Sequence, residues 1–162
     1  MTDKREQGAR IKMMIQQEKA IAKLYTVFAG CFPERKILWM EFAEEEKEHA
    51  AYLKRLYNAF KRREVRFSAD RFPRKLLEES LNFIQTNIRK AKQKEFSALN
   101  ALSLALSLEK AVIERDFFRL FNGDSPAVAE ILTYLARSTR EHAQKIQDEW
   151  STHIKKPARN SD

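Results

Sequence analysis

The sequence predicts an all-α fold: a four-helix bundle made of two antiparallel helical hairpins, joined by a long crossover that contains an extra short helix. Three observations lead to this prediction. Only 3 glycines and 4 prolines occur in 162 residues, a composition that favours long helices over a sheet with many turns. Apolar residues recur at spacings of three and four along four long segments. Strong turn signals lie between the first and second segments and between the third and fourth.

The first hairpin occupies the N-terminal part of the chain. Apolar residues from about Glu6 to Ala29 follow a helical period, and Gly30 is expected to end this helix. Pro33 suits the first turn of a second helix, which we expect from about Pro33 to Arg62. Because the link between the two helices is short, we expect them to be antiparallel.

The crossover and the second hairpin follow. The stretch from Arg62 to Phe72 is basic and turn-prone, so we expect a loop, after which Pro73 opens a shorter helix that belongs to the crossover. A third long helix is expected from about Glu95 to Phe121, and a fourth from about Pro126 to Trp150. Two short-linked pairs with a long connection between them match a bundle with one crossover.

Length, cysteine usage and charge limit the class of protein. The chain is long enough for one domain, which we place at residues 1–150, followed by a loose basic tail at residues 151–162. Cys31 is the only cysteine, as is typical of a reducing cytosol, and no apolar run reaches the length of a membrane span. We therefore expect a cytoplasmic protein without a membrane partner. The net charge of +8 fits nucleic acid, but no nucleic-acid-binding motif accompanies it, so a solvated basic connector is the preferred interpretation.

Acids and histidines interrupt the apolar stripe of each long helix. These residues are Glu18 in the first, Glu46 and His49 in the second, Glu109 in the third and His142 in the fourth. A buried carboxylate is costly unless it is paired or bound to a cation, so four helices that turn such groups inward require a compensating charge. Glu46 and His49 are three residues apart and can hold one ion from one helix face. Carboxylate and imidazole ligands suit iron, manganese or zinc, and the carboxylate excess favours a di-iron or iron–manganese pair.

An internal repeat favours a shared site over chance. The block FAEEEKEHA, residues 42–50, aligns with LARSTREHA, residues 135–143, and each block follows a helix that contains Glu-Lys-Ala. Glu18 precedes His49 by 31 residues, and Glu109 precedes His142 by 33. Taken singly, a Glu-x-x-His motif is more often a surface pair, and a lone histidine is more often a core residue. A metal-free helical bundle is therefore the alternative.

The same segments resemble the rubrerythrin family. QQEKAIAKLYTVFAG with FAEEEKEHAAYLKRL resembles the first hairpin of rubrerythrin and its ferritin-like relatives, and SLEKAVIERDFFRLF with LARSTREHAQKI resembles the second. The resemblance covers about Ile11 to Trp150. It implies a ferritin-like bundle with a non-haem di-iron centre that reduces peroxide or reacts with dioxygen. It also implies ligand roles: Glu18 and Glu109 as terminal carboxylates, Glu46 as a bridge, and His49 and His142 as imidazole ligands.

Two features depart from the family pattern. Thr139 stands where the family has its second bridging carboxylate, and the neighbouring Glu141 points about 100° away on an ideal helix. The cysteine-ligated rubredoxin module of full-length rubrerythrin is absent from this sequence, because one cysteine cannot build a four-cysteine site. Any turnover therefore requires an external electron donor.

Tyr25 is the candidate catalytic side chain. It follows Glu18 by two turns on the same helix face, where its hydroxyl can bond to a ligating carboxylate, and the alternative is a core aromatic. We expect an oxidoreductase of the peroxidase type that holds two iron ions, with manganese or zinc as the other candidate metals. The alternatives are a metal-handling protein with a degraded site and no turnover, or a helical adaptor. Trp39 and Trp150 exceed what one small core accommodates, so we also expect a homo-oligomer, most simply a dimer.

Overall fold

Helices make up most of the computed structural model, which describes residues 3–68, 73–115, 117–123 and 125–155, without the side chains of residues 112–118. The five α-helices are α1 (Lys4–Cys31), α2 (Lys36–Lys61), α3 (Arg74–Lys92), α4 (Ala98–Arg115) and α5 (Pro126–Lys155). Two 3-10 turns, Pro33–Arg35 and Phe117–Leu120, and two short strands, β1 (Arg66–Phe67) and β2 (Phe121–Asn122), complete the described elements. The predicted all-α class is confirmed.

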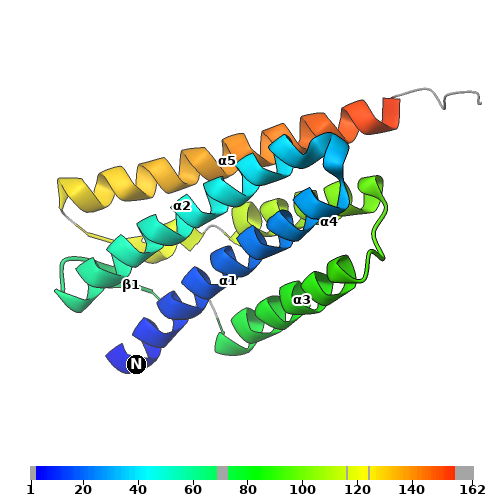
Figure 1. Cartoon of the computed structure of the whole chain (residues 1–162). Coiled ribbons are helices and arrows are strands. Elements are labelled where there is room, and N and C mark those ends of the chain that lie inside the picture. The colour runs from blue at the N-terminus through cyan, green and yellow to red at the C-terminus, as the bar shows by residue number, and fades with distance from the viewer. Residues whose placement is uncertain (1–2, 69–72, 116, 124, 156–162) are drawn as a thin grey trace, which may run out of the picture.

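The long helices pack in pairs. α1 lies against α2, and α4 lies against α5, with the members of each pair running in opposite directions (Figure 1). α2 also contacts α5, which connects the two pairs. α3, the short crossover helix, packs on α1 at the outside of the molecule (Figure 1).

Several helix ends differ by a few residues from the predicted ones. α1 continues through Gly30 to Cys31, since one glycine costs a helix only about 1 kcal/mol. A 3-10 turn at Pro33–Arg35 precedes α2, so the proline opens a tight turn before the α-helix starts. α5 extends to Lys155, so the first five residues of the predicted tail are helical, whereas residues 156–162 lie outside the described chain.

The third long helix is shorter than predicted at both ends. α4 begins at Ala98, where Ser97 Oγ accepts a hydrogen bond from the backbone N–H of Asn100 at 3.1 Å. At the other end, α4 stops at Arg115, a 3-10 turn at Phe117–Leu120 takes the place of the last predicted helical turn, and β2 begins at Phe121. β2 pairs antiparallel with β1, with Phe121 opposite Phe67. β1 in turn lies inside the segment that we predicted to be a loop. The buried rings of Phe67 and Phe121 are 4.9 Å apart, and this contact between distant segments overrides the local helical pattern.

The apolar core consists of two clusters. One contains Ile11, Met14 and Ile15 of α1, Leu53, Leu56 and Phe60 of α2, and Leu135 of α5. The other contains Ile21, Tyr25 and Phe28 of α1, Trp39 and Phe42 of α2, Leu102 and Leu106 of α4, and Ile146 of α5. Along each of α1, α2 and α5, buried polar residues lie between the positions that belong to the two clusters. The core is therefore divided by a polar layer.

One chain accommodates both tryptophans. Trp39 is buried and contacts the rings of Tyr25, Phe28 and Phe42. Trp150 is partly buried and donates a hydrogen bond from Nε1 to Ser103 Oγ at 2.9 Å. The formation of a homo-oligomer stays a prediction.

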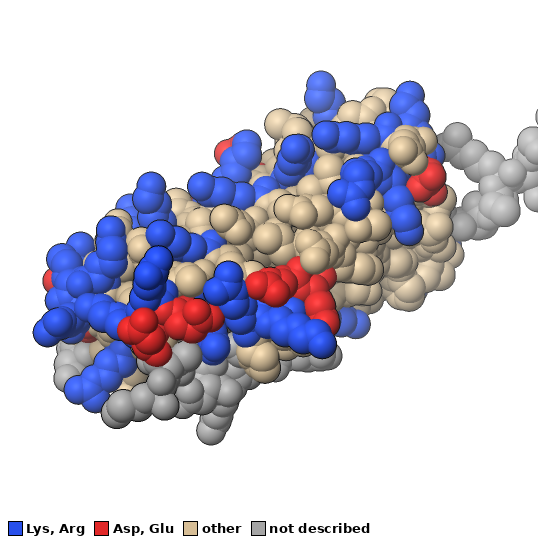
Figure 2. Space-filling view, turned by 90° about the horizontal axis from the view of Figure 1, so that it is seen from below, with Lys and Arg blue, Asp and Glu red and all other residues tan. Residues whose placement is uncertain are grey.

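Lysine and arginine side chains are spread over the face seen in Figure 2. Two arginines of the basic connection are paired: Arg62 with Glu64 at 2.9 Å, and Arg74 with Glu78 at 2.9 Å and with Glu6 of α1 at 3.5 Å. Both arginines are exposed, as expected for a solvated connector. Among the described helices, none combines the length and the apolar character that crossing a bilayer requires.

Candidate metal centre

The polar layer contains all five predicted metal ligands. Three carboxylates and two imidazoles converge on it: Glu18 from α1, Glu46 and His49 from α2, Glu109 from α4 and His142 from α5. Each is at most 6% exposed, whereas ionisable side chains are almost never fully buried unless they are paired. The layer brings together side chains from four helices, as the apolar stripes predict.

The first group consists of Glu18, Glu46 and His49. One carboxylate oxygen of each glutamate and one ring nitrogen of His49 lie within 4.8 Å of one another. His49 Nδ1 is 3.6 Å from Glu46 Oε2, a separation that follows from their spacing of three residues on α2. These three atoms could hold one metal ion.

The second group consists of Glu46, Glu109 and His142. One ligand atom from each residue again lies within 4.8 Å of the other two. His142 Nδ1 is 2.6 Å from Glu46 Oε1 and 3.5 Å from Glu109 Oε1. Glu46 is common to both groups, and its two oxygens face different histidines: Oε2 faces His49, and Oε1 faces His142. This is the arrangement that a carboxylate bridge between two ions requires.

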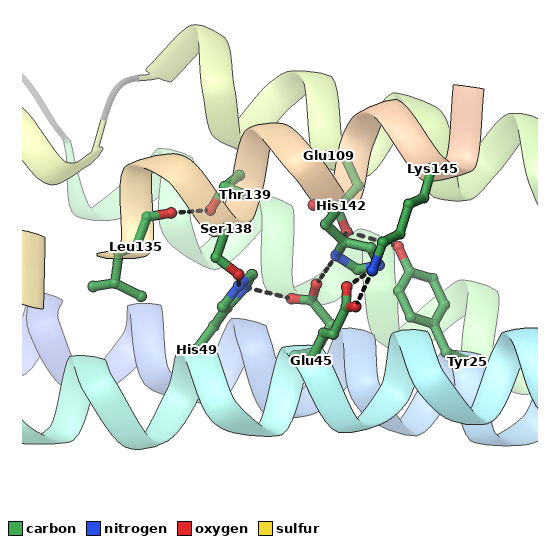
Figure 3. Close-up of polar contacts among 10 residues, drawn as sticks. Tyr25, Glu45, His49, Glu109, Leu135, Ser138, Thr139, His142 and Lys145 are labelled. Atoms are coloured by element: carbon green, nitrogen blue, oxygen red, sulfur yellow. Dashed lines mark hydrogen bonds and ion pairs between the residues drawn. The ribbon is translucent and has the colours of Figure 1, made fainter. Parts of the chain in front are cut away.

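Tyr25 is connected directly to the second group. Its hydroxyl donates a hydrogen bond to Glu109 Oε1 at 3.0 Å, so it reaches a carboxylate on another helix rather than Glu18 on its own (Figure 3). The tyrosine is fully buried, and its ring lies edge-on to His142 and beside Trp39. Tyr25 is thus both a core aromatic and a hydrogen-bond donor to a candidate ligand.

Several buried polar atoms in the layer lack a hydrogen bond. Among the described residues, neither ring nitrogen of His142 nor Glu46 Oε1 has a partner of acceptable hydrogen-bond geometry, although His142 Nδ1 and Glu46 Oε1 are close. Buried polar atoms are normally satisfied, and such exceptions point to an unseen ion or water. A divalent cation coordinated by both atoms would satisfy them. The donor set of carboxylate oxygens and imidazole nitrogens fits iron, manganese or zinc.

When no cation is bound, burial and mutual repulsion disfavour the ionised form of the three carboxyl groups in the layer. Burial raises the pKa of Glu18 and of Glu109 well above the ordinary value, and the neighbouring charge of Glu46 raises both pKa values further. Burial also raises the pKa of Glu46, although the neighbouring carboxyls of Glu18 and Glu109 lower it in part. Burial lowers the pKa of His142. In the metal-free protein, shared protons therefore take the place of positive charge.

Two residues close to His142 in the sequence, Thr139 and Glu141, bear on the second bridging carboxylate that the family pattern would place here. Thr139 is buried one turn before His142, and its hydroxyl donates to Leu135 O of its own helix at 2.8 Å. Glu141 points away from the layer, as predicted, because its carboxylate is exposed and lies 4.0 Å from Arg137. Among the described residues, neither group contains a further carboxylate that could take the place of a glutamate at position 139.

The sequence interpretation missed three residues next to the histidines (Figure 3). Ser138 Oγ lies 2.7 Å from His49 Nε2, and Glu45 Oε2 lies 3.6 Å from His142 Nε2. Lys145 in turn pairs with the other oxygen of Glu45 at 2.8 Å. Ser138 lies four residues before His142, and this spacing, which puts both residues on one helix face, could have predicted that Ser138 is near the layer. Glu45 and Lys145 carried no signal, because charged residues are common on helix surfaces.

The centre combines buried acids, two imidazoles and a shared carboxylate, a set that can bind divalent metal and, with a redox metal, transfer electrons. Each group offers three protein ligands, which leaves room for water or a small oxidant on each ion. Comparisons of the chain with protein-family models, with curated proteins and with solved structures found no match.

Proposed function

We propose that this chain is a rubrerythrin-like, non-haem di-iron protein that reduces peroxide or reacts with dioxygen, and that its helices form a ferritin-like bundle. The observation that carries the proposal is the position of Glu46, whose two oxygens face Nδ1 of His49 and Nδ1 of His142. The resemblance of both hairpins to rubrerythrin supports the same assignment. Manganese or zinc would satisfy the same donor atoms.

The protein's own groups would bind and orient the ions. Glu18 and Glu109 would each supply a terminal carboxylate, and Tyr25 would hold Glu109 through its hydrogen bond. Two bound iron ions would supply the two electrons that, with two protons, convert hydrogen peroxide into two water molecules. An external donor would return those electrons. The apolar clusters on both sides of the layer limit the access of water.

The runner-up function is metal handling without turnover. The observation that favours it is Thr139, which is neutral and bonded to its own helix, so the second group has no additional carboxylate. A ferric ion is stabilised by anionic oxygen ligands, and a site with fewer of them holds the oxidised form less tightly. This alternative predicts ferrous binding without rapid oxidation.

Oxidation of the ferrous-loaded protein separates these functions. We expect purified protein to bind up to two ferrous ions per chain without oxygen, and stoichiometric peroxide to oxidise both ions faster than it oxidises free ferrous ion. The physical reason is that anionic ligands stabilise the ferric product more than the ferrous reactant. Anaerobic stopped-flow absorbance, with iron counted by elemental analysis, measures both quantities. Two bound ions that react no faster than free ferrous ion would establish the runner-up function instead.

Replacing Thr139 with glutamate is expected to tighten the second metal position and speed peroxide-dependent oxidation. Position 139 is buried one turn before His142, so a carboxylate there would add negative charge beside the cations. Without metal, the added buried acid costs stability, so metal should raise the melting temperature of Thr139→Glu more than that of wild type. Thr139→Gln is the matched control, because it adds similar volume without charge. Equal metal-induced shifts in all three proteins would show that residue 139 does not face the metals.

A further inference from the structure

His49 makes a short hydrogen bond on the side of its ring that faces away from the carboxylates. Its Nε2 is 2.7 Å from Ser138 Oγ on α5, whereas its Nδ1 faces Glu46 Oε2 at 3.6 Å (Figure 3). A neutral imidazole carries its proton on one nitrogen only, and the bond made by one nitrogen decides which lone pair the other offers to a metal. The role of Ser138 therefore depends on where its own hydroxyl proton goes.

Tyr134 is the neighbour of Ser138 one turn earlier on α5, and it also lies near Glu48 of α2. Burial is the main reason that the pKa of Tyr134 rises to about 12.

The surroundings of Ser138 on this side reach solvent. The ring of Tyr134 stacks on Tyr52 of α2, with centroids 4.2 Å apart and planes 26° apart. Tyr134 also lines an open pocket of about 710 Å³ between α2 and α5. Glu48 is exposed.

The bond between His49 Nε2 and Ser138 Oγ leaves one arrangement in which Nδ1 can bind a metal. A neutral imidazole that offers its Nδ1 lone pair toward Glu46 carries its ring proton on Nε2, and Ser138 Oγ then accepts that proton. His142 has no such support, because among the described residues its Nε2 has no hydrogen bond and Glu45 lies 3.6 Å away.

We propose that Ser138 is a positioning residue of the metal centre: by accepting the Nε2 proton it holds His49 in the tautomer that presents Nδ1 to Glu18 and Glu46, and so makes this the tighter of the two metal positions. This inference rests on metal binding as proposed above, and it goes beyond that function by assigning unequal affinities to the two positions. Outer hydrogen-bond partners of metal-binding histidines commonly contribute about 10–100-fold to affinity.

Three variants on α5 test the role of Ser138. Ser138→Ala removes the acceptor and is expected to weaken the tighter position by about 10–100-fold for zinc, with the second position unchanged. Ser138→Thr keeps the hydroxyl and is expected to restore the affinity. Thr152→Ala is the control, because its hydroxyl donates only to Asp148 O of its own helix, and wild-type affinity is expected. Competition titration with a chelating dye measures both zinc affinities.

The tautomer is a second readout that does not depend on turnover. In metal-free protein labelled with ¹⁵N-histidine, the His49 shifts are expected to show an Nε2–H tautomer in wild type and Ser138→Thr, and a mixture of tautomers in Ser138→Ala. Unchanged zinc affinity and unchanged His49 shifts in Ser138→Ala would overturn the positioning role alone. Failure of the wild type to bind zinc or ferrous ion would instead overturn the proposed function.

Discussion

Replacing Glu46 with alanine is expected to abolish tight ferrous binding at both positions of the centre. Glu46 belongs to both candidate groups, and each of its oxygens faces a different histidine. Its loss therefore removes one of three protein ligands from each ion at once. The affinity of both positions should fall by more than the about 100-fold that an outer partner of a ligand can contribute. Anaerobic calorimetry with ferrous ion measures the stoichiometry and both dissociation constants.

Single-histidine variants and an exposed acid are the controls for Glu46. His49→Ala and His142→Ala are each expected to remove one ion and leave the other, since each histidine belongs to one group only. Glu44→Ala changes an acid on the same helix that is 65% exposed and pairs with Lys47, so it should bind two ions like the wild type. Two ions bound by Glu46→Ala with wild-type affinity would contradict the bridging role. Loss of both ions from Glu44→Ala would point to general damage to the bundle.

The metal-free protein is expected to lose stability as pH rises from about 5 to 8, and bound metal is expected to restore it most at the upper end. The cause is the buried set of Glu18, Glu46 and Glu109, whose pKa values are all raised above 4.5 by burial first. In the folded metal-free state these carboxyls hold their protons to a higher pH than in the unfolded chain. Above pH 4.5 the folded state therefore binds more protons, and the free energy of unfolding falls as pH rises.

His142 changes the free energy of unfolding in the opposite direction as pH rises through the same interval. Burial lowers its pKa below 6.5, so the folded state binds fewer protons there and the free energy of unfolding rises with pH up to about 6.5. Three carboxyls oppose this one imidazole, and the change in its contribution fades above pH 6.5 as the unfolded imidazole loses its proton. The clearest interval is therefore pH 6.5 to 8, where the remaining loss comes from the carboxyls whose pKa values are raised furthest, those of Glu18 and Glu109.

Thermal unfolding with and without zinc, at pH 5, 6.5 and 8, measures this effect. At free zinc about 100-fold above the dissociation constant, each bound ion adds about 2.7 kcal/mol, which corresponds to roughly 5–10 °C for a protein of this size. The shift should be largest at pH 8, because metal binds deprotonated carboxylates. Glu109→Gln should flatten the pH dependence of the metal-free protein, and the exposed Glu44→Gln should leave it unchanged. Identical melting temperatures with and without zinc at every pH would contradict a metal centre.

The helices and the identity of the inward-facing polar residues were predictable from the sequence. An apolar period of three to four places Glu18, Glu46, His49, Glu109 and His142 on buried stripes whatever the neighbouring helices are, because side-chain direction on a helix follows from residue number alone. The structure buries all five of them. The all-α class followed from the same period and from the scarcity of glycine and proline.

The ends of the third long helix and the second strand were not predictable in this way. Phe121 continues a helical period, yet it pairs with Phe67 in a two-stranded ladder. A strand this short has almost no local signal, since its hydrogen bonds and its ring contact come from a segment far away in the sequence. The burial of Trp39 inside one chain likewise depends on how α1 and α2 pack.

The sequence by itself determined that five ionisable side chains point into one helical interior. Only the tertiary structure decided which atoms of these side chains meet: that Glu46 Oε1 and Oε2 face different histidines, that Tyr25 bonds to Glu109 rather than to Glu18, and that Ser138 reaches His49. The physical reason is that direction around a helix is a local property of the chain. The axial position of one helix relative to its neighbour depends on the packing between them. Hydrogen bonds between helices form only when this axial position is correct within a fraction of a turn.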